Sequence, residues 1–232
     1  MKKILPIVTA LFLFIGTYMT FYYAVPLKGL QETYYILFWH VPFNWVATVL
    51  IGCSAFWGFK YIKTNMVDYA LKSYAVNCVG FIFCLYGNLS GMAWGQLQWG
   101  GIGIENLDPK FLSAVFSLFI YSSYFIFRNS ISEEDAKFRL SSVYSMISFP
   151  FLIFFSFVLP RLKFSLHPNN PIFQMKKKVV EGKVETSSSF GAENGITMLV
   201  TILAVTCVSV LIYKLRYRME KVQYKLEEEL YG

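Results

Sequence analysis

Apolar residues occur along the chain in six runs of about 17 to 20 positions, and the charged residues gather between them. Runs of this length with few charges are typical of helices that cross the ~30 Å hydrocarbon core of a membrane. The predicted spans cover residues 4–23, 41–59, 73–92, 111–127, 140–159 and 195–213. The pattern therefore predicts an all-α integral membrane protein with six transmembrane helices and with both termini on one side.

Local signals mark where two of these helices are expected to begin. Pro42 fits the first turn of the helix at residues 41–59, because its missing N–H would have no partner there in any case. His40 is then expected at the helix start, at the depth of the membrane interface. Asp108 followed by Pro109 resembles an N-cap residue and an N1 proline, so the fourth helix is expected to begin there.

The last third of the chain contains two prolines and two polar segments. Pro150 is expected to kink the fifth span near its middle, and Pro160 to end it. The polar stretch at residues 174–190, with its lysine and serine runs, is expected to be solvated and partly mobile. Residues 214–232 alternate apolar and charged residues at helical spacing, which predicts a helical tail at the membrane surface.

Composition and charge agree with a membrane protein. The chain is 56% hydrophobic and 15% charged, which is too little charge for a soluble domain of 232 residues. Thirteen of the 21 Lys and Arg residues lie on the side of the two termini. The positive-inside rule then predicts cytoplasmic termini in a multi-pass protein of the cell inner membrane, in contact with lipid. We expect no nucleic-acid partner, because no basic stripe with interleaved aromatic residues is present.

The four cysteines are expected to be small buried residues. Cys53, Cys78, Cys84 and Cys207 all fall inside predicted spans, and no CxxC or CxxCH motif occurs. The sequence therefore argues against a disulfide framework, a zinc site and covalent haem attachment. It also shows no nucleophile–base pair, carboxylate dyad or phosphate-binding loop, so the protein is not expected to be an enzyme.

The candidate chemistry is at the predicted outer face. His40 and His167, the only histidines, are 127 positions apart, and the topology returns both to this face. Two neutral imidazoles could fill both axial positions of a haem iron. The glycine-rich stretch at residues 91–110 is expected to be a loop that lies on the membrane surface and holds Trp94 and Trp99 against the porphyrin.

Three basic residues lie near the same interface and could form ion pairs with the haem propionates; they are Arg161, Lys163 and Lys110. Each candidate residue also has a purely structural interpretation. A histidine or tryptophan at a span end is often an interfacial side chain, and Asp108 could act only as a helix cap. Arg161 could be a cation that reaches from the helix end to water.

These residues carry a resemblance to a known family. The order of His-Val-Pro at the start of the second span, a Trp- and Gly-rich outer segment leading to Asp108-Pro109-Lys110, and His167-Pro168 resembles the CcmC-type haem-handling proteins of cytochrome c maturation. The resemblance extends from about His40 to the sixth span. This chain departs from the family's tryptophan-rich motif, because Gly103, Glu105 and Asn106 occupy the positions where Trp, Trp and Asp are expected.

The resemblance implies a function. A protein of this type holds haem b non-covalently at the outer face and passes it to a small membrane-anchored haem chaperone. It implies axial ligation by His40 and His167, and Trp94 and Trp99 in the haem-facing segment. It also implies an ABC transporter complex as a partner.

Two other classes remain open from the residues. A b-type cytochrome subunit would carry electrons, and it typically needs histidine pairs within facing spans, whereas neither histidine is predicted inside a span. A transport permease without haem would be expected to have ionisable residues at mid-membrane depth, where Asn77 is the nearest polar candidate.

Overall fold

The computed structural model describes residues 4–27, 33–99, 108–162, 175–180, 183–188 and 190–231. Its long helices are α1 (Ile4–Tyr22), α2 (Tyr34–Thr64), α3 (Val67–Trp99), α4 (Pro109–Asn129), α5 (Glu134–Ile153) and α7 (Ala192–Tyr231). A π-helical turn, η3 (Phe154–Val158), and a short helix, α6 (Leu159–Leu162), continue α5. Six helical segments are long and apolar enough to cross a membrane, which confirms the predicted fold class.

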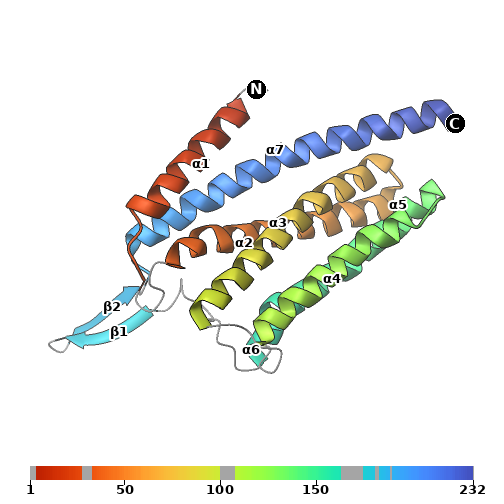
Figure 1. Cartoon of the computed structure of the whole chain (residues 1–232). Helices are drawn as coiled ribbons and strands as arrows, with labels where there is room; N and C mark the ends of the chain where they lie inside the picture. The colour runs from red at the N-terminus through yellow and green to blue at the C-terminus, as the bar shows by residue number, and fades with distance from the viewer. Residues whose placement is uncertain are drawn as a thin grey trace.

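The helices form two hairpins and one antiparallel pair. The α2–α3 hairpin lies at the centre, α1 runs alongside the first half of α7, and α4 pairs with α5 (Figure 1). Asn65 makes the sharp α2–α3 turn possible, because it adopts a left-handed φ of 52° and donates its N–H to the carbonyl of Tyr61 at 2.7 Å. We call the end of the bundle where α2 begins and α3 ends the His40 end, and the opposite end the termini end.

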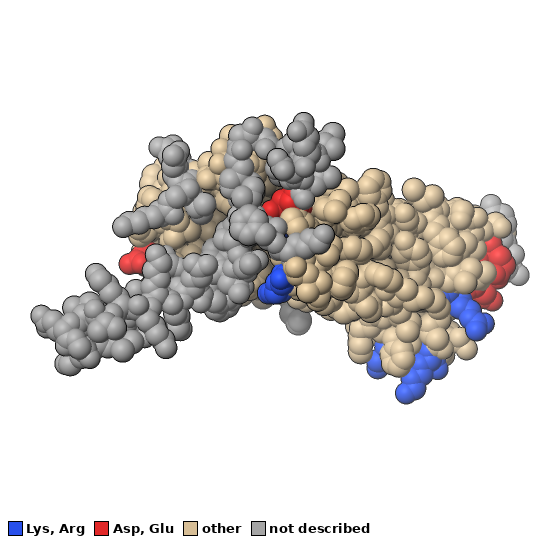
Figure 2. Space-filling view, turned by 90° about the horizontal axis from the view of Figure 1, so that it is seen from below, with Lys and Arg blue, Asp and Glu red and all other residues tan. Residues whose placement is uncertain are grey.

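Charged side chains are distributed as a membrane protein requires. On the face shown in Figure 2, the described Lys, Arg, Asp and Glu residues lie toward the two ends of the bundle, and a broad uncharged surface lies between them. Large apolar side chains are exposed along this middle region, for example Phe119 at 66% and Leu199 at 58%. Such exposure is favourable only where lipid replaces water.

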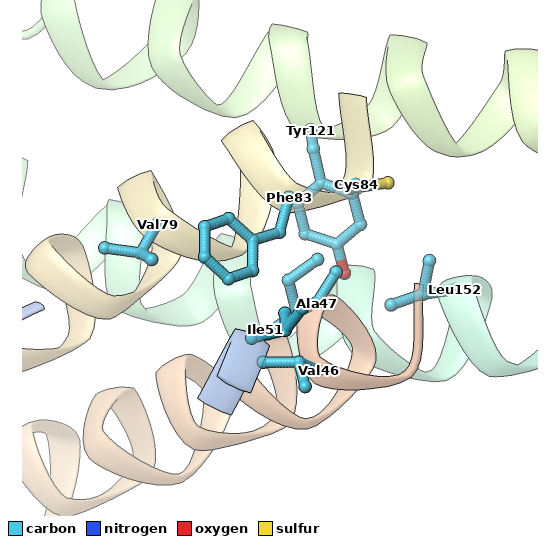
Figure 3. Packing of buried hydrophobic residues seen from close by; sticks show 9 residues of the cluster. Val46, Ala47, Ile51, Val79, Phe83, Cys84, Tyr121 and Leu152 are labelled. Carbon is cyan, nitrogen blue, oxygen red and sulfur yellow. The ribbon is translucent and has the colours of Figure 1, made fainter. Parts of the chain in front are cut away.

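The core lies where α2, α3, α4, α5 and α7 meet (Figure 3). Its buried members are Val46, Ala47, Ile51, Val79, Phe83, Cys84, Tyr121, Leu152 and Val205. Cys84 is a buried free thiol, as the sequence predicts for a small apolar residue. Because lipid tails are as apolar as these side chains, close packing and interhelical hydrogen bonds must stabilise the bundle.

Small and hydroxyl residues supply those contacts. The Ser54 hydroxyl lies 3.1 Å from that of Ser73 and 3.2 Å from that of Ser145, so one α2 side chain links α3 and α5. One turn along α2, a Cβ on Gly58 would lie 3.0 Å from the carbonyl oxygen of Ser142. The backbones of α2 and α5 are therefore nearly in contact, and Gly58 permits this approach.

The start of α2 differs from the prediction. The helix begins at Tyr34, so Pro42 lies in its interior and His40 nearly two turns inside it. The expectations that Pro42 occupies the first turn and that His40 precedes the span are wrong. Residues 34–38 are apolar and pack against Phe190 and Met198, so their burial extends the helix past a proline that the sequence pattern treats as a start signal.

The tryptophan- and glycine-rich segment also differs. Residues 91–99 continue α3 as helix, so the expectation of a surface loop is wrong for them. The buried side chain of Trp94 and the glycines beside α2 favour continued packing of the two helices. Residues 100–107 lie outside the described residues.

Prolines in the fifth span do not break it where the sequence predicts. Pro150 lies inside α5, and the π-helical turn η3 follows it within one turn. Pro160 lies within α6, which extends to Leu162, so the expectation that it ends the helix is wrong by two residues. Lipid-embedded helices tolerate proline because local π turns and neighbouring groups re-pair the freed carbonyls.

A short hairpin and a long helix complete the fold. Strands β1 (Met175–Val180) and β2 (Lys183–Ser188) pair antiparallel, with Met175 opposite Ser188, in the polar stretch that is predicted from the sequence to be solvated and partly mobile. α7 is one continuous helix of 40 residues, so the tail at residues 214–231 extends the sixth span without a break.

We expect Gly58→Val to lower stability, because the added methyl groups would meet the backbone of Ser142. Overpacking of this kind costs about 1–3 kcal/mol. Thermal unfolding in mild detergent measures the effect. Gly195→Val is the matched control, since a Cβ at Gly195 of α7 meets nothing within 4 Å. Equal melting temperatures of the two variants would show that α2 and α5 do not approach this closely.

Candidate functional site

His40 is fixed by three partners at the His40 end of the α2–α3 hairpin. Its Nδ1 lies 2.8 Å from the carbonyl oxygen of Gly87 and 3.2 Å from the hydroxyl of Ser90, both on α3. The Asn44 amide nitrogen lies 3.4 Å away and also donates to the His40 carbonyl at 2.9 Å. Since a carbonyl can only accept, Nδ1 carries the proton in the neutral ring, and Nε2 carries the lone pair that can bind a metal.

Glycines on α3 make this position possible. A Cβ on Gly91 would lie 2.5 Å from Cε1 of His40, and a Cβ on Gly87 would lie 2.5 Å from the Asn44 amide nitrogen. Any larger residue at either position would push the α2 side chain away. The two glycines, spaced four residues apart, therefore form a flat helix face against which the imidazole rests.

The two candidate tryptophans lie on either side of this face. At 3.6 residues per turn, Trp94 falls about 60° to one side of Gly91 and Trp99 about 80° to the other. Trp94 is buried, with 7% of its surface exposed. Of Trp99, the structure describes the backbone as the last residue of α3. The helix thus brings both positions near His40, although not as part of a loop.

Asp108 acts as a helix cap. Its side chain accepts a hydrogen bond from the backbone N–H of Lys110 at 2.8 Å, and Pro109 follows as the first helical residue of α4. This confirms the structural interpretation of the Asp-Pro pair. With 7% of its surface exposed, Asp108 is buried at the His40 end.

Two cations stand at the same end on other helices. The Lys110 Nζ donates to the carbonyl of Ser156 in η3 at 3.2 Å, which ties the start of α4 to the end of the fifth span. Arg161 is exposed and donates to the carbonyl of Phe157, one turn before it. Both side chains therefore bond neighbouring carbonyls of η3, which brings their positive charges to the same place. They form a basic cluster that could bind carboxylates.

The structure thus places some of the candidate residues close together and does not describe others. His40 contacts α3 at Gly87, Ser90 and Gly91, before Trp94 and Trp99 along the helix. Lys110 in α4 and Arg161 in α6 both bond carbonyls of η3, and α6 lies beside the start of α4 (Figure 1). His167 and Lys163 lie outside the described residues.

The sequence analysis missed the residues that hold His40. Asn44 follows it by one helical turn, and the Gly87–Gly91 spacing is a small-residue motif for close helix packing. Both signals are in the sequence, but they gain meaning only when α2 is known to begin before His40.

Comparison with known protein families matches residues 1–230 to the family described as heme exporter protein C, CcmC. The chain belongs to this family. Its members are haem-handling membrane proteins of cytochrome c biogenesis and are not enzymes, which agrees with the class predicted from the sequence.

A curated relative agrees with the family. The chain is 23% identical over 174 residues to a putative cytochrome c biosynthesis ccmC-like mitochondrial protein of Marchantia polymorpha. The aligned part covers 75% of this chain and spans 66% of the length of that relative.

We expect Asp108→Ala to destabilise the start of α4 by about 1 kcal/mol, because it removes a side-chain acceptor at the N-cap. Asp108→Asn should retain most of the stability, since asparagine caps helices about as well as aspartate. Thermal unfolding in detergent compares the two. If the alanine variant unfolds at the wild-type temperature, Asp108 does not stabilise the helix.

Proposed function

We propose that this protein binds haem non-covalently at the His40 end and passes it to a membrane-anchored haem chaperone during cytochrome c maturation. The observation that carries the proposal is the hydrogen bond from His40 Nδ1 to the Gly87 carbonyl. It selects the tautomer in which Nε2 can bind iron and fixes the direction of the ring. Partners of this kind orient metal-binding histidines in many proteins.

His167 is the proposed second axial ligand. It is the only other histidine in the chain and falls in the connection between α6 and β1, which leaves the bundle at the His40 end. Bis-histidine ligation would give a low-spin haem that can be released when one ligand dissociates.

The remaining candidates would orient the porphyrin. Lys110 and Arg161 supply two positive charges for the propionates, and charge-assisted hydrogen bonds of this type are stronger than neutral ones. Trp94 and Trp99 flank the His40 face and would contact the macrocycle. On the proposed topology, the His40 end faces outward from the cell inner membrane, and an ABC transporter complex would act with the protein.

A b-type cytochrome is the second candidate, because His40 lies inside a membrane-spanning helix and not before it. The sequence argument that neither histidine lies within a span is therefore wrong for His40. Membership of the haem exporter protein C family favours haem delivery over electron transfer. Transfer of haem to an added chaperone, without change of iron oxidation state, would distinguish the two functions.

We expect His40→Ala and His167→Ala each to lose most of the haem that copurifies with the wild-type protein. The pyridine haemochrome absorbance per mole of purified protein measures retention. Gln96→Ala, an exposed change on α3 near the site, should retain the wild-type amount. Wild-type haem content in both histidine variants would exclude axial ligation by these residues.

We expect Gly91→Ala to lower haem retention severalfold although no ligand is removed, since the new methyl group would displace the imidazole of His40. The displaced ring should also shift the Soret maximum or the spin state. Gly195→Ala adds the same methyl group where nothing lies within 4 Å, and should bind normally. Unchanged spectra for Gly91→Ala would contradict the close approach of α3 to His40.

A further inference from the structure

The tail of α7 presents an apolar stripe that no described helix covers. Its members recur at spacings of three and four residues and are more than half exposed; they are Leu215 at 59%, Met219 at 60%, Val222 at 59%, Leu226 at 52% and Leu230 at 71%. At 3.6 residues per turn these side chains fall within about 80° around the helix. The first four follow the 4-3-4 spacing of a coiled-coil seam, and Leu230 stands beside the next seam position, which is Glu229. We call these five residues the tail stripe.

The tail stripe lies beyond the membrane-embedded part of the bundle. α1 packs antiparallel on α7, and a Cβ on Gly16 would lie 3.3 Å from Thr201. Ile4 precedes Gly16 by twelve residues, which places the start of α1 level with Tyr213, twelve residues after Thr201. Lys214, Arg216 and Arg218 follow at once, as cations do at a membrane boundary. Lipid therefore does not cover the stripe.

The opposite face of the tail fixes its direction. Tyr217 donates to Asp68 of α3, and the ring centroid of Tyr224 lies 5.9 Å from that of Phe138 in α5. Glu220 is buried and pairs with Arg216 at 2.7 Å. The tail is thus held along the direction of the sixth span (Figure 1), and its stripe faces away from the bundle.

The charged residues beside the tail stripe indicate what kind of molecule binds to it. Lys214, Arg218 and Lys225 are exposed along one flank of the stripe, so this flank is basic although Glu229 also lies on it. Neutral Gln223 lies on the other flank together with Arg216, which is paired with Glu220. A second copy of the chain in the same membrane would place its tail parallel to this one. In such a pair, Gln223 and Leu230 of one copy would lie opposite Arg218 and Lys225 of the other, so these positions would form no ion pair. A helix with acidic flanks would pair with these cations.

We propose that the tail stripe is the docking surface for an amphipathic helix of a partner protein, with an apolar face bordered by Asp or Glu. The stripe is about 24 Å long, enough for two heptads of such a helix. Binding would cover the apolar side chains that otherwise face water and would pair the basic flank. This contact lies at the end of the bundle opposite His40 and does not depend on haem binding.

A pair of designed peptides tests the proposal. Each has about three heptads with Leu at the a and d positions; one carries Glu and the other Lys at the e and g positions. The full chain, in nanodiscs of zwitterionic lipid, is titrated against each labelled peptide by fluorescence anisotropy. We expect the acidic peptide to bind at least about tenfold more tightly than the basic one, because only it complements the flank.

Two sets of variants locate the contact. Met219→Glu with Leu226→Glu should weaken binding of the acidic peptide by about tenfold or more, and Arg218→Glu with Lys225→Glu should reverse the preference between peptides. Glu228→Ala, exposed on another side of the tail, is the control. Thermal unfolding and haem content should stay at wild-type values in all three variants.

Three results would overturn the proposal. They are equal binding of both peptides, binding that survives the Met219 and Leu226 substitutions, and a change from dimer to monomer in those variants by light scattering. The last result would assign the stripe to a second copy of the chain.

Discussion

The approach of α3 to α2 is the contact on which the rest of the bundle depends. Three glycines of α3 face α2 in antiparallel register: Gly80 against Ile51, Gly87 against Asn44 and Gly91 against His40. In a membrane, apolar burial gains little, so helices associate where their backbones can come close enough for dense packing and hydrogen bonds. The glycines meet this requirement along about a third of the length of the hairpin, and α5 and α7 then pack around it.

This contact also makes His40 part of a rigid framework. The imidazole is held by the backbone carbonyl of one helix while its own backbone belongs to another, so its direction is set by helix packing and not by a loop. A metal-binding ring fixed in this way is pre-oriented, and less entropy is lost when a ligand binds.

The amino-acid sequence predicts the larger features of this fold because they follow from hydrophobic length alone. Six spans and the cap at Asp108 appear as expected, and of the four cysteines Cys84 is fully buried while the other three are partly exposed. Errors occur where tertiary packing overrides a local signal. Pro42 suggests a helix start, but burial of residues 34–38 extends α2 beyond it. Glycines at residues 91 and 95 suggest a loop, but both lie within α3, and Gly91 packs against His40.

The candidate site can likewise be predicted only in part from the sequence. A histidine pair can be selected from the sequence, since only two histidines exist and the predicted topology returns both to one face. The carbonyl of Gly87 and the side chain of Ser90 cannot be selected in this way. They are partners only because two helices cross with a particular register. That register depends on contacts of His40 with residues that follow it by 47 to 51 positions in the chain.

The π-helical turn η3 has a consequence for the cation cluster. A π turn accommodates one residue more than an α-helical turn, so every side chain after it is rotated by about 100° relative to an uninterrupted α-helix. Arg161 follows η3 and owes its position near Lys110 to that extra residue. Deleting one residue from Phe154–Val158 would turn the guanidinium toward another side of the helix. Family members that lack the π turn should therefore align with a single-residue gap here and carry their cation one position out of register.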